Sequence, residues 1–140
     1  MDIYREQFTR LENEILNFLF INAGKGFNQR EIALSLKVSP TAVANSVKSL
    51  MKTDLLNVVK GKNTKPSSVS LNTSNEIVFH LKRVENLRNF YESGLMDLFK
   101  DKLPEATIIL FGSYSLGEDL YSSDIDIAIE REEIEEYKIF

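Results

Sequence analysis

Phe111-Gly112-Ser113-Tyr114-Ser115-Leu116-Gly117 is the stretch that decides the fold of the C-terminal half of this chain, and Asp124-Ile125-Asp126-Ile127 follows it after six residues. The preceding apolar run, Ala106–Phe111, is rich in β-branched residues and ends at glycine, which predicts a strand buried on both faces. Gly112 permits a sharp turn. Ser113 stands where a short helix would begin, and Gly117 would end that helix as a left-handed cap.

A second strand is expected at Asp124–Ile129, where polar and apolar side chains alternate. One face would carry three isoleucines that enter the core, Ile125, Ile127 and Ile129. Asp124 and Asp126 would share the other face, about 7 Å apart along the strand. Two such carboxylates repel each other unless a cation lies between them. Mg²⁺ prefers oxygen ligands of this kind, so the pair predicts a site for Mg²⁺ or Mn²⁺.

The Gly-Ser turn supplies the second half of the predicted site. The hydroxyl of Ser113 and the free N–H groups of the following helical turn can hold a phosphate oxygen. Gly-Ser and Asp-x-Asp are each common in ordinary turns. Their combination on a strand–turn–helix–strand frame predicts a nucleoside triphosphate held together with a divalent metal.

Gly112-Ser113, the ten residues after them and Asp124-Ile125-Asp126 resemble the signature of the DNA polymerase β-like nucleotidyltransferase superfamily, and most closely its minimal branch. The resemblance implies that Gly112 and Ser113 bind the triphosphate, and that Asp124 and Asp126 are catalytic metal ligands. Many minimal members carry a basic residue where this chain has Leu116. The family also uses a third carboxylate, to which no residue is assigned here, since Glu130 would lie about 13 Å along the strand from Asp126.

The N-terminal half predicts helix, helix, turn, helix and hairpin. Asn28 and Glu31 have capping-box spacing, and Ser39-Pro40 suits the start of a helix over Thr41–Thr53. The inward-facing side chains of the second and third helices would be Ile32, Ala33, Leu34, Leu36, Val43, Val47, Leu50 and Met51. Strands at Leu55–Lys60 and Ser67–Leu71 would flank a basic loop. This half resembles a winged helix-turn-helix domain similar to MarR-type regulators.

A DNA-binding surface is predicted on this domain. Residues 1–73 carry ten Lys/Arg and six Asp/Glu, whereas residues 74–140 carry seven and fifteen, which indicates separate partners for the two halves. The side chains expected to meet DNA are those of the third helix, Thr41, Ala42, Asn45, Ser46 and Lys48, and of the loop, Lys60, Lys62 and Lys65. The alternative is a solvated helix face beside an ordinary basic hairpin tip.

The segment between the halves predicts helix, with apolar residues near a heptad spacing at Ile77, Leu81, Val84, Tyr91, Leu95 and Leu98. Ser93-Gly94 is expected to kink or split it. The helix would serve as a dimer contact or, alternatively, as a strut packed on both halves. His80, the one histidine, is interpreted as structural.

We therefore expect an α+β protein in three parts. These are a winged helix-turn-helix domain at 1–73, a helical linker at 74–102 and a nucleotidyltransferase-like α/β sheet at 103–140. The sheet is expected to be incomplete at its C-terminus, because two strands and a short helix bury a sheet face poorly. Residues from Glu132 onward have the pattern of a solvated helix start. The absence of cysteine and of long apolar runs predicts a cytoplasmic protein with no membrane contact.

Three functions remain open from the sequence. The first is a DNA-tethered, Mg²⁺-dependent enzyme that moves a nucleoside monophosphate from a triphosphate to an unidentified acceptor. The second is a transcription regulator whose transferase-like part binds a nucleotide without turnover. The third is an antitoxin-like protein that modifies or sequesters a protein partner.

Overall fold

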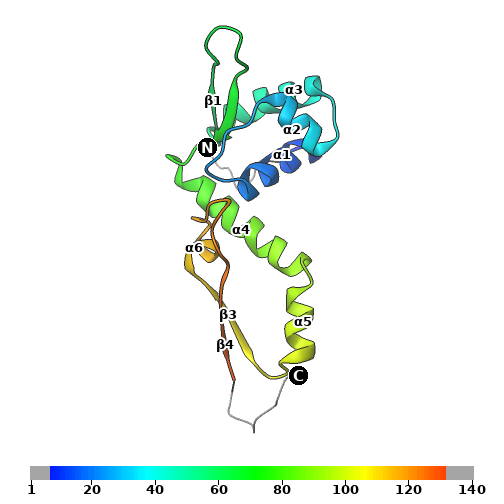
Figure 1. Cartoon of the computed structure of the whole chain (residues 1–140), viewed down its shortest axis with the longest axis vertical. Helices are drawn as coiled ribbons and strands as arrows, with labels where there is room; N and C mark the ends of the chain where they lie inside the picture. Colours follow the sequence, from blue (N-terminus) through cyan, green and yellow to red (C-terminus); the bar gives the residue numbers. More distant parts are fainter. Residues whose placement is uncertain (1–6, 132–140) are drawn as a thin grey trace.

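A computed structural model describes residues 7–131, and the helix expected from residue 132 lies outside this range. The molecule is elongated, with a winged helix at one end and a two-stranded sheet toward the other, joined by helix α4 (Figure 1). The chain is an α+β protein, as predicted. Its elements are α1 (Arg10–Ile21), α2 (Gln29–Leu36), α3 (Pro40–Leu50), η2 (Met51–Thr53), β1 (Leu56–Val59), β2 (Ser68–Leu71), α4 (Glu76–Glu92), α5 (Leu95–Lys102), β3 (Thr107–Phe111), α6 (Gly112–Leu116) and β4 (Asp126–Glu130).

The first three helices begin at side-chain caps. Asn28 and Glu31 form the predicted capping box at α2, with bonds of 3.0 and 2.8 Å. Ser39 caps α3, and Pro40 occupies its first turn. A second capping box, between Thr9 and Glu12, starts α1. These caps satisfy N–H groups that the helices leave unpaired, so the helix boundaries are set locally by the sequence.

The wing is an antiparallel hairpin of β1 and β2, in which Leu56 pairs with Leu71 and Val59 with Ser68. Phe27 adds an isolated bridge to Val69. Both strands were predicted, and each is a residue or two shorter than expected. The pairing of Phe27 ties the segment between α1 and α2 to the wing.

The core of the molecule lies in the winged helix. Its buried apolar members come from α1, α2, α3, both wing strands, the first turn of α4 and two positions in the connections: Ile15, Leu16, Leu19, Phe20, Ala23, Ile32, Ala33, Val43, Val47, Leu50, Leu55, Leu56, Val69, Leu71 and Val78. Helix α4 is thus part of this unit's core as well as its connection to the rest of the chain.

Two predicted core residues are exposed. Leu34 is 80% exposed, because it lies two residues after Ile32, on the opposite side of a short helix whose buried side chains are Ile32 and Ala33. Met51 is also exposed. It begins the 3₁₀ turn η2, where the helical period tightens from 3.6 to about 3 residues and rotates the side chain outward.

The linker splits into α4 and α5 at Ser93-Gly94, as expected, and Gly94 adopts a φ of +78°. The heptad stripe was only partly right. Ile77 and Leu81 pack against the core, whereas Val84 and Tyr91 are exposed. The buried residues of α4 recur every fourth position instead, at Val78, Lys82, Asn86 and Phe90.

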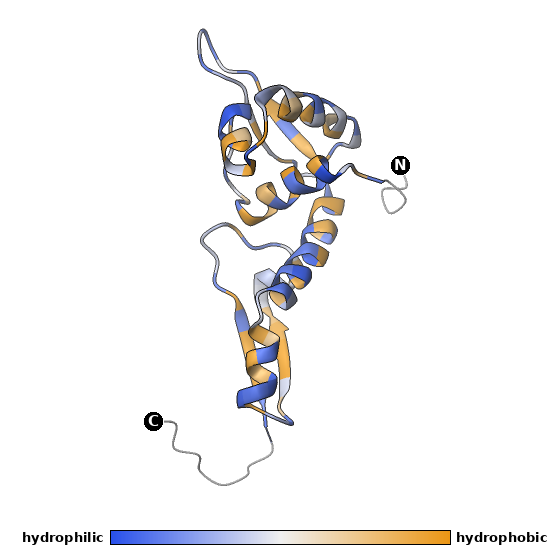
Figure 2. Cartoon of the chain, turned by 90° about the vertical axis from the view of Figure 1, so that its right-hand side faces the viewer, coloured by the Kyte–Doolittle hydropathy of each residue, from blue (hydrophilic) through white to orange (hydrophobic). Residues whose placement is uncertain are grey.

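Strands β3 and β4 pair in antiparallel register, from Thr107 opposite Glu130 to Phe111 opposite Asp126. Both are largely hydrophobic (Figure 2), yet the expectation of burial on both faces was wrong. Phe111 is 48% exposed and Ile109 is exposed as well. Of the isoleucines expected in the core, Ile125 and Ile129 are exposed and Ile127 is half-buried. Two strands without a covering layer cannot bury a sheet face.

None of the helices in residues 7–131 is long and apolar enough to cross a membrane.

Leu50→Ala should lower the free energy of unfolding by about 2–5 kcal/mol, because it opens a cavity in the winged-helix core. Leu34→Ala, in the neighbouring helix, should change it by no more than about 0.5 kcal/mol. Urea denaturation followed by circular dichroism measures both. Equal losses in the two variants would contradict the assignment of the core.

Candidate functional site

The register of β3 and β4 brings the Gly-Ser turn and the second aspartate together. Phe111, the last residue of β3, pairs with Asp126, the first residue of β4. The carboxylate of Asp126 therefore lies against Gly112, where a Cβ atom would clash with Asp126 Oδ2. Gly112 also has a φ of +73°. A side chain at position 112 would be strained by this backbone conformation and would force Asp126 to move.

Ser113 lies in the first turn of α6, as predicted, and is half-buried. No side chain of the described residues caps this turn. The other end of α6 is closed by its own backbone, since Glu118 N–H donates to the Ser113 carbonyl at 2.9 Å. Gly117 takes the predicted left-handed conformation, with φ +75°. The unpaired N–H groups of α6 are thus at its Ser113 end.

Asp124 differs from its predicted position, because β4 begins at Asp126 rather than at Asp124. Asp124 lies in the segment just before the strand, and both carboxylates are exposed. A tight turn precedes it, closed by two hydrogen bonds of 2.9 Å between Leu120 and Ser123. An exposed carboxylate against the Gly-Ser turn, with a second two residues before it in the chain, fits a Mg²⁺ that takes its remaining ligands from phosphate and water.

No group of three His, Cys, Asp or Glu side chains suited to a metal occurs within residues 7–131. Glu130 stands at the far end of β4, opposite Thr107, which agrees with its exclusion from the Asp126 site. The acidic residues after Arg131 lie outside the described range.

A buried polar cluster joins this site to α4, and sequence reasoning missed it. Lys82, only 2% exposed, forms an ion pair with Asp119. Asn86 donates to Asp119 Oδ1 at 2.7 Å and to the Tyr114 carbonyl at 2.9 Å. Tyr114 returns a bond from its hydroxyl to the Asn86 carbonyl at 2.9 Å. We call Lys82, Asn86, Tyr114 and Asp119 the α4 clasp.

The α4 clasp perturbs two of its ionisable groups. Burial lowers the pKa of Lys82, and the hydrogen bond and charge of Asp119 oppose that shift. Burial raises the pKa of Tyr114, and the charge of Asp119 adds to the rise. Both shifts have the causes expected of a cluster shielded from water around one carboxylate.

The segment between the Gly-Ser turn and Asp124 also contacts the winged helix at the turn after α1. The Tyr121 N–H donates to the Ala23 carbonyl at 3.1 Å. The Lys25 ammonium lies 3.7 Å from the centre of the Tyr121 ring, a cation–π contact. The side chain of Leu120 lies against Gly24. The segment is therefore held by α4 and by the 23–25 turn of the winged helix.

A cavity of about 750 Å³ runs along α4, between α1 on one side and β3 with α6 on the other. His80 and Arg83 line it, together with apolar side chains such as Leu81 and Leu110. Gly112, Ser113, Asp124 and Asp126 do not. This cavity is distinct from the predicted triphosphate site.

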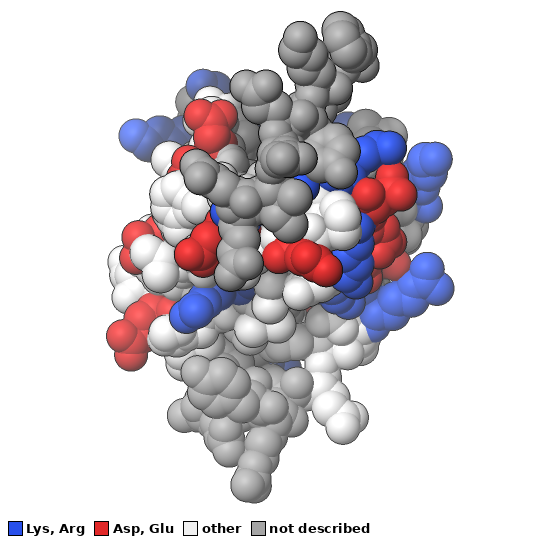
Figure 3. All heavy atoms as spheres, turned by 90° about the horizontal axis from the view of Figure 1, so that it is seen from below, with Lys and Arg blue, Asp and Glu red and all other residues white. Residues whose placement is uncertain are grey.

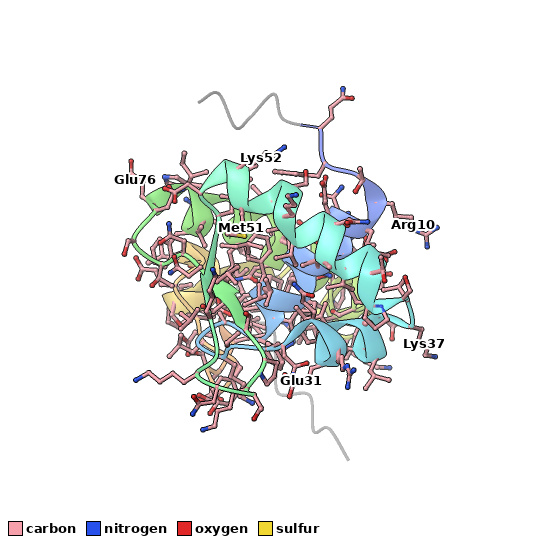
Figure 4. All side chains as sticks on the ribbon, turned by 90° about the horizontal axis from the view of Figure 1, so that it is seen from above. Arg10, Glu31, Lys37, Met51, Lys52 and Glu76 are labelled. Atoms are coloured by element: carbon pink, nitrogen blue, oxygen red, sulfur yellow. The ribbon has the colours of Figure 1, made fainter. Side chains whose placement is uncertain are left out.

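The predicted DNA-binding residues lie at the opposite end of the molecule, near the wing (Figure 1). The exposed members of the set are Thr41, Asn45 and Lys48 on α3 and Lys60, Lys62 and Lys65 on the wing, whereas Ala42 and Ser46 are half-buried. Viewed from this end, Lys37 and Arg10 project outward from the rim (Figure 4). At the other end, acidic and basic side chains are interspersed (Figure 3).

Sequence reasoning also missed a small cavity of about 260 Å³ beside the wing. Gln29 and Arg30 from the start of α2, Pro40 from the start of α3 and Ser67 from the wing line it. The residues that line it are far apart in sequence. The capping motifs at Asn28 and Ser39 predicted the N-termini of α2 and α3, but not that both line one cavity. Arg30, in the first turn of α2, gives this cavity a positive charge that suits a phosphate.

Residues 93–138 match the protein family described as nucleotidyltransferase domain. The matched range is about a third of the chain. It begins at the bend between α4 and α5 and includes the Gly-Ser turn and both aspartates. The match supports the nucleotidyltransferase part of the resemblance inferred from these motifs. Among curated protein sequences, none matches the chain.

Several solved structures share the fold of much of the chain. The adhesin competence repressor AdcR of Streptococcus pyogenes has a TM-score of 0.53 at 19% identity, with 72% of each chain covered. A mutant of ZitR from Lactococcus lactis has a TM-score of 0.53 at 19% identity, covering 72% of this chain and 66% of that one. MepR of Staphylococcus aureus has a TM-score of 0.51 at 18% identity, covering 71% of this chain and 69% of that one. These are MarR-family winged-helix proteins, and the likeness confirms the winged-helix fold.

Tyr114 should ionise at higher pH than an ordinary tyrosine, because burial and the Asp119 charge both raise its pKa by disfavouring the phenolate. An ultraviolet absorbance titration of the full chain should show a late-titrating phenol that is missing in Tyr114→Phe. Tyr91→Phe, on the exposed side of α4, serves as the matched control. Identical late phases in wild type and Tyr114→Phe would contradict the raised pKa.

Proposed function

We propose that this protein is a metal-dependent nucleotidyltransferase that is tethered to DNA through its winged helix. The observation that carries the proposal is the register of β3 and β4, which sets the Asp126 carboxylate against Gly112 at the start of α6. A phosphate held at the Gly112-Ser113 turn would lie beside a metal held by Asp126. The match of residues 93–138 to the nucleotidyltransferase domain supports the same interpretation.

In this proposal Asp124 and Asp126 hold Mg²⁺, or Mn²⁺, which would bridge to the phosphates and neutralise charge as an acceptor oxygen attacks the α-phosphate. Ser113 and the first N–H groups of α6 would hold a phosphate oxygen. Gly112 would keep the turn free of a side chain, so that phosphate and carboxylate approach each other closely. The nucleoside monophosphate would pass to an acceptor of unidentified class.

The winged helix would supply the DNA tether. Asn45, exposed on α3, would face the major groove, while the wing lysines Lys62 and Lys65 would contact backbone phosphates. Arg30, in the cavity at the starts of α2 and α3, would take a further phosphate. Two of the structures with this fold are named as a repressor and a transcription regulator, which supports a role at DNA.

A second candidate is a regulator that binds a triphosphate as an effector without turnover. One observation favours it. The described residues include no group of three carboxylates suited to a metal, and the family uses three for catalysis. In this version the nucleotide would still bind at Gly112 and Ser113 with Mg²⁺. Release of pyrophosphate distinguishes the two candidates.

Asp126→Asn should abolish Mg²⁺-dependent binding of ATP, because the substitution keeps the size of the side chain and removes the charge that attracts the metal. Ser113→Ala should weaken binding less, since the N–H groups of α6 remain. Titration calorimetry with ATP, with and without Mg²⁺, measures both on the full chain.

Asp97→Asn is the matched control, because Asp97 is an exposed carboxylate in the first turn of α5. It should bind ATP as the wild type does. The winged helix should stay folded and keep its DNA affinity in all these variants. Equal, metal-independent ATP binding by wild type and Asp126→Asn would remove the support for the transferase site.

Lys62→Ala combined with Lys65→Ala should weaken binding to most DNA sequences alike and should reduce the salt dependence by about one contact for each lysine that touches a phosphate. Asn45→Ala should instead alter sequence preference. Fluorescence anisotropy with labelled duplexes at several salt concentrations measures both effects. Lys100→Ala with Lys102→Ala, at the end of α5, is the control and should have no effect. If neither the wing nor the Asn45 change affects DNA affinity, the winged helix is a protein-contact module.

A further inference from the structure

The nucleotidyltransferase end of the described chain has almost no interior of its own. Among residues 103–131, the buried positions are Gly117 and Asp119. Both lie against α4. A Cβ added to Gly117 would clash with the Phe79 carbonyl oxygen, and Asp119 pairs with the buried Lys82. The buried contacts of α6 and the following segment are therefore contacts with α4.

Helix α4 is itself fixed by the winged helix. Val78, one turn before Lys82, is fully buried in the winged-helix core. Asn89, further along, donates to Asn17 of α1 at 3.2 Å. The helix thus presents Lys82 and Asn86 from a rigid support, whereas α6 has five residues and no buried side chain.

We propose that Lys82, Asn86 and Asp119 are positioning residues for the triphosphate site. The geometry of this site then depends on α4 and, through α4, on the winged helix. The inference rests on the proposed function, because it names what holds the Gly112-Ser113 turn in place. None of the three residues is expected to touch the nucleotide.

The geometry of the α4 clasp gives these residues control over both sides of the turn. The Asn86 side chain donates to the carbonyl of Tyr114, the residue next to Ser113, and the Asn86 backbone carbonyl accepts from the Tyr114 hydroxyl. Asp119, held by Lys82 and Asn86, fixes the segment that leads to Asp124. If either anchor is lost, β3 and β4 still hold Asp126 beside Gly112, but α6 with Ser113 and the segment that leads to Asp124 can shift relative to that pair. Displacements of about 1 Å are enough to disable sites of this kind.

Stability alone does not account for the clasp. Replacing a buried ion pair by apolar side chains is often neutral or stabilising, whereas removing one partner is costly because it leaves a buried charge. An apolar contact at these positions would attach α6 to α4 as firmly. Apolar packing would allow α6 to slide along α4. The directional hydrogen bonds from Asn86 to two separate acceptors fix α6 in a single position along α4.

The test compares ATP binding, with Mg²⁺, by the full chain and four variants. Lys82→Met leaves Asp119 unpaired and should weaken ATP binding by about tenfold or more. Adding Asp119→Asn removes that stranded charge and keeps an acceptor for Asn86, so the double variant should recover affinity to within about threefold of wild type. Asn86→Leu should weaken binding as Lys82→Met does, with no charge altered. Val47→Ala, in the winged-helix core, should destabilise the fold and leave ATP affinity unchanged.

DNA affinity should stay at the wild-type value in the three clasp variants, because their winged-helix core is intact. Amide hydrogen exchange without ligand supplies a measurement that does not depend on ATP. Residues 112–117 should exchange faster in Lys82→Met and Asn86→Leu, and should return to the wild-type rate in the double variant.

The possible failures are distinct. A wild-type chain that binds no ATP overturns the proposed function, and the exchange rates then still decide whether the clasp holds α6. Wild-type ATP affinity in both Lys82→Met and Asn86→Leu overturns the positioning role. Loss of affinity in Val47→Ala equal to that in Lys82→Met would reduce the clasp to a general contribution to stability, which also overturns the inference.

Discussion

The ion pair between Lys82 and Asp119 is the buried charged contact that joins the two ends of the molecule. An ammonium that is 2% exposed is costly to bury, and Asp119 is its charged partner among the described residues. Asn86 and Tyr114 complete the surroundings of the carboxylate and of α6. Because such a cluster is stable only when its members are in place together, it joins α4 and α6 in one arrangement.

This constraint explains why the two ends differ so much in construction. The winged helix has a continuous apolar core drawn from five helices and strands and the start of α4. The sheet of β3 and β4 has exposed apolar side chains on its strands and no buried ones. A sheet of two strands is at best marginally stable alone. Its position is therefore set by α6 and the segment after it, which are attached to α4 and to the 23–25 turn.

Much of the fold could be predicted from sequence because the signals are local. Capping boxes, the Ser39-Pro40 start and the glycines at 94 and 117 fix boundaries through neighbouring residues. The Gly-Ser and Asp-Ile-Asp motifs predicted the candidate site, and residues 93–138, which match the nucleotidyltransferase domain, include both motifs. Burial was predicted less well, since it depends on layers that a strand's own sequence does not specify. The strand that ends at Phe111 has the apolar composition of a central strand, yet Phe111 is exposed because no further layer packs on this sheet among the described residues.

The α4 clasp could not be predicted for a related reason. An apolar stripe is the usual signal of a buried helix face, and that rule selected Val84 and Tyr91, which are exposed. The true buried face alternates, with Val78 and Phe90 at its ends and Lys82 and Asn86 between them. Polar residues are buried where specific partners meet them, and Asp119 lies 37 residues away in the chain from Lys82. The partner carboxylate is brought to Lys82 only by the three-dimensional arrangement of the chain. Hydropathy alone therefore assigns Lys82 and Asn86 to the solvent-exposed face of α4, although both are buried.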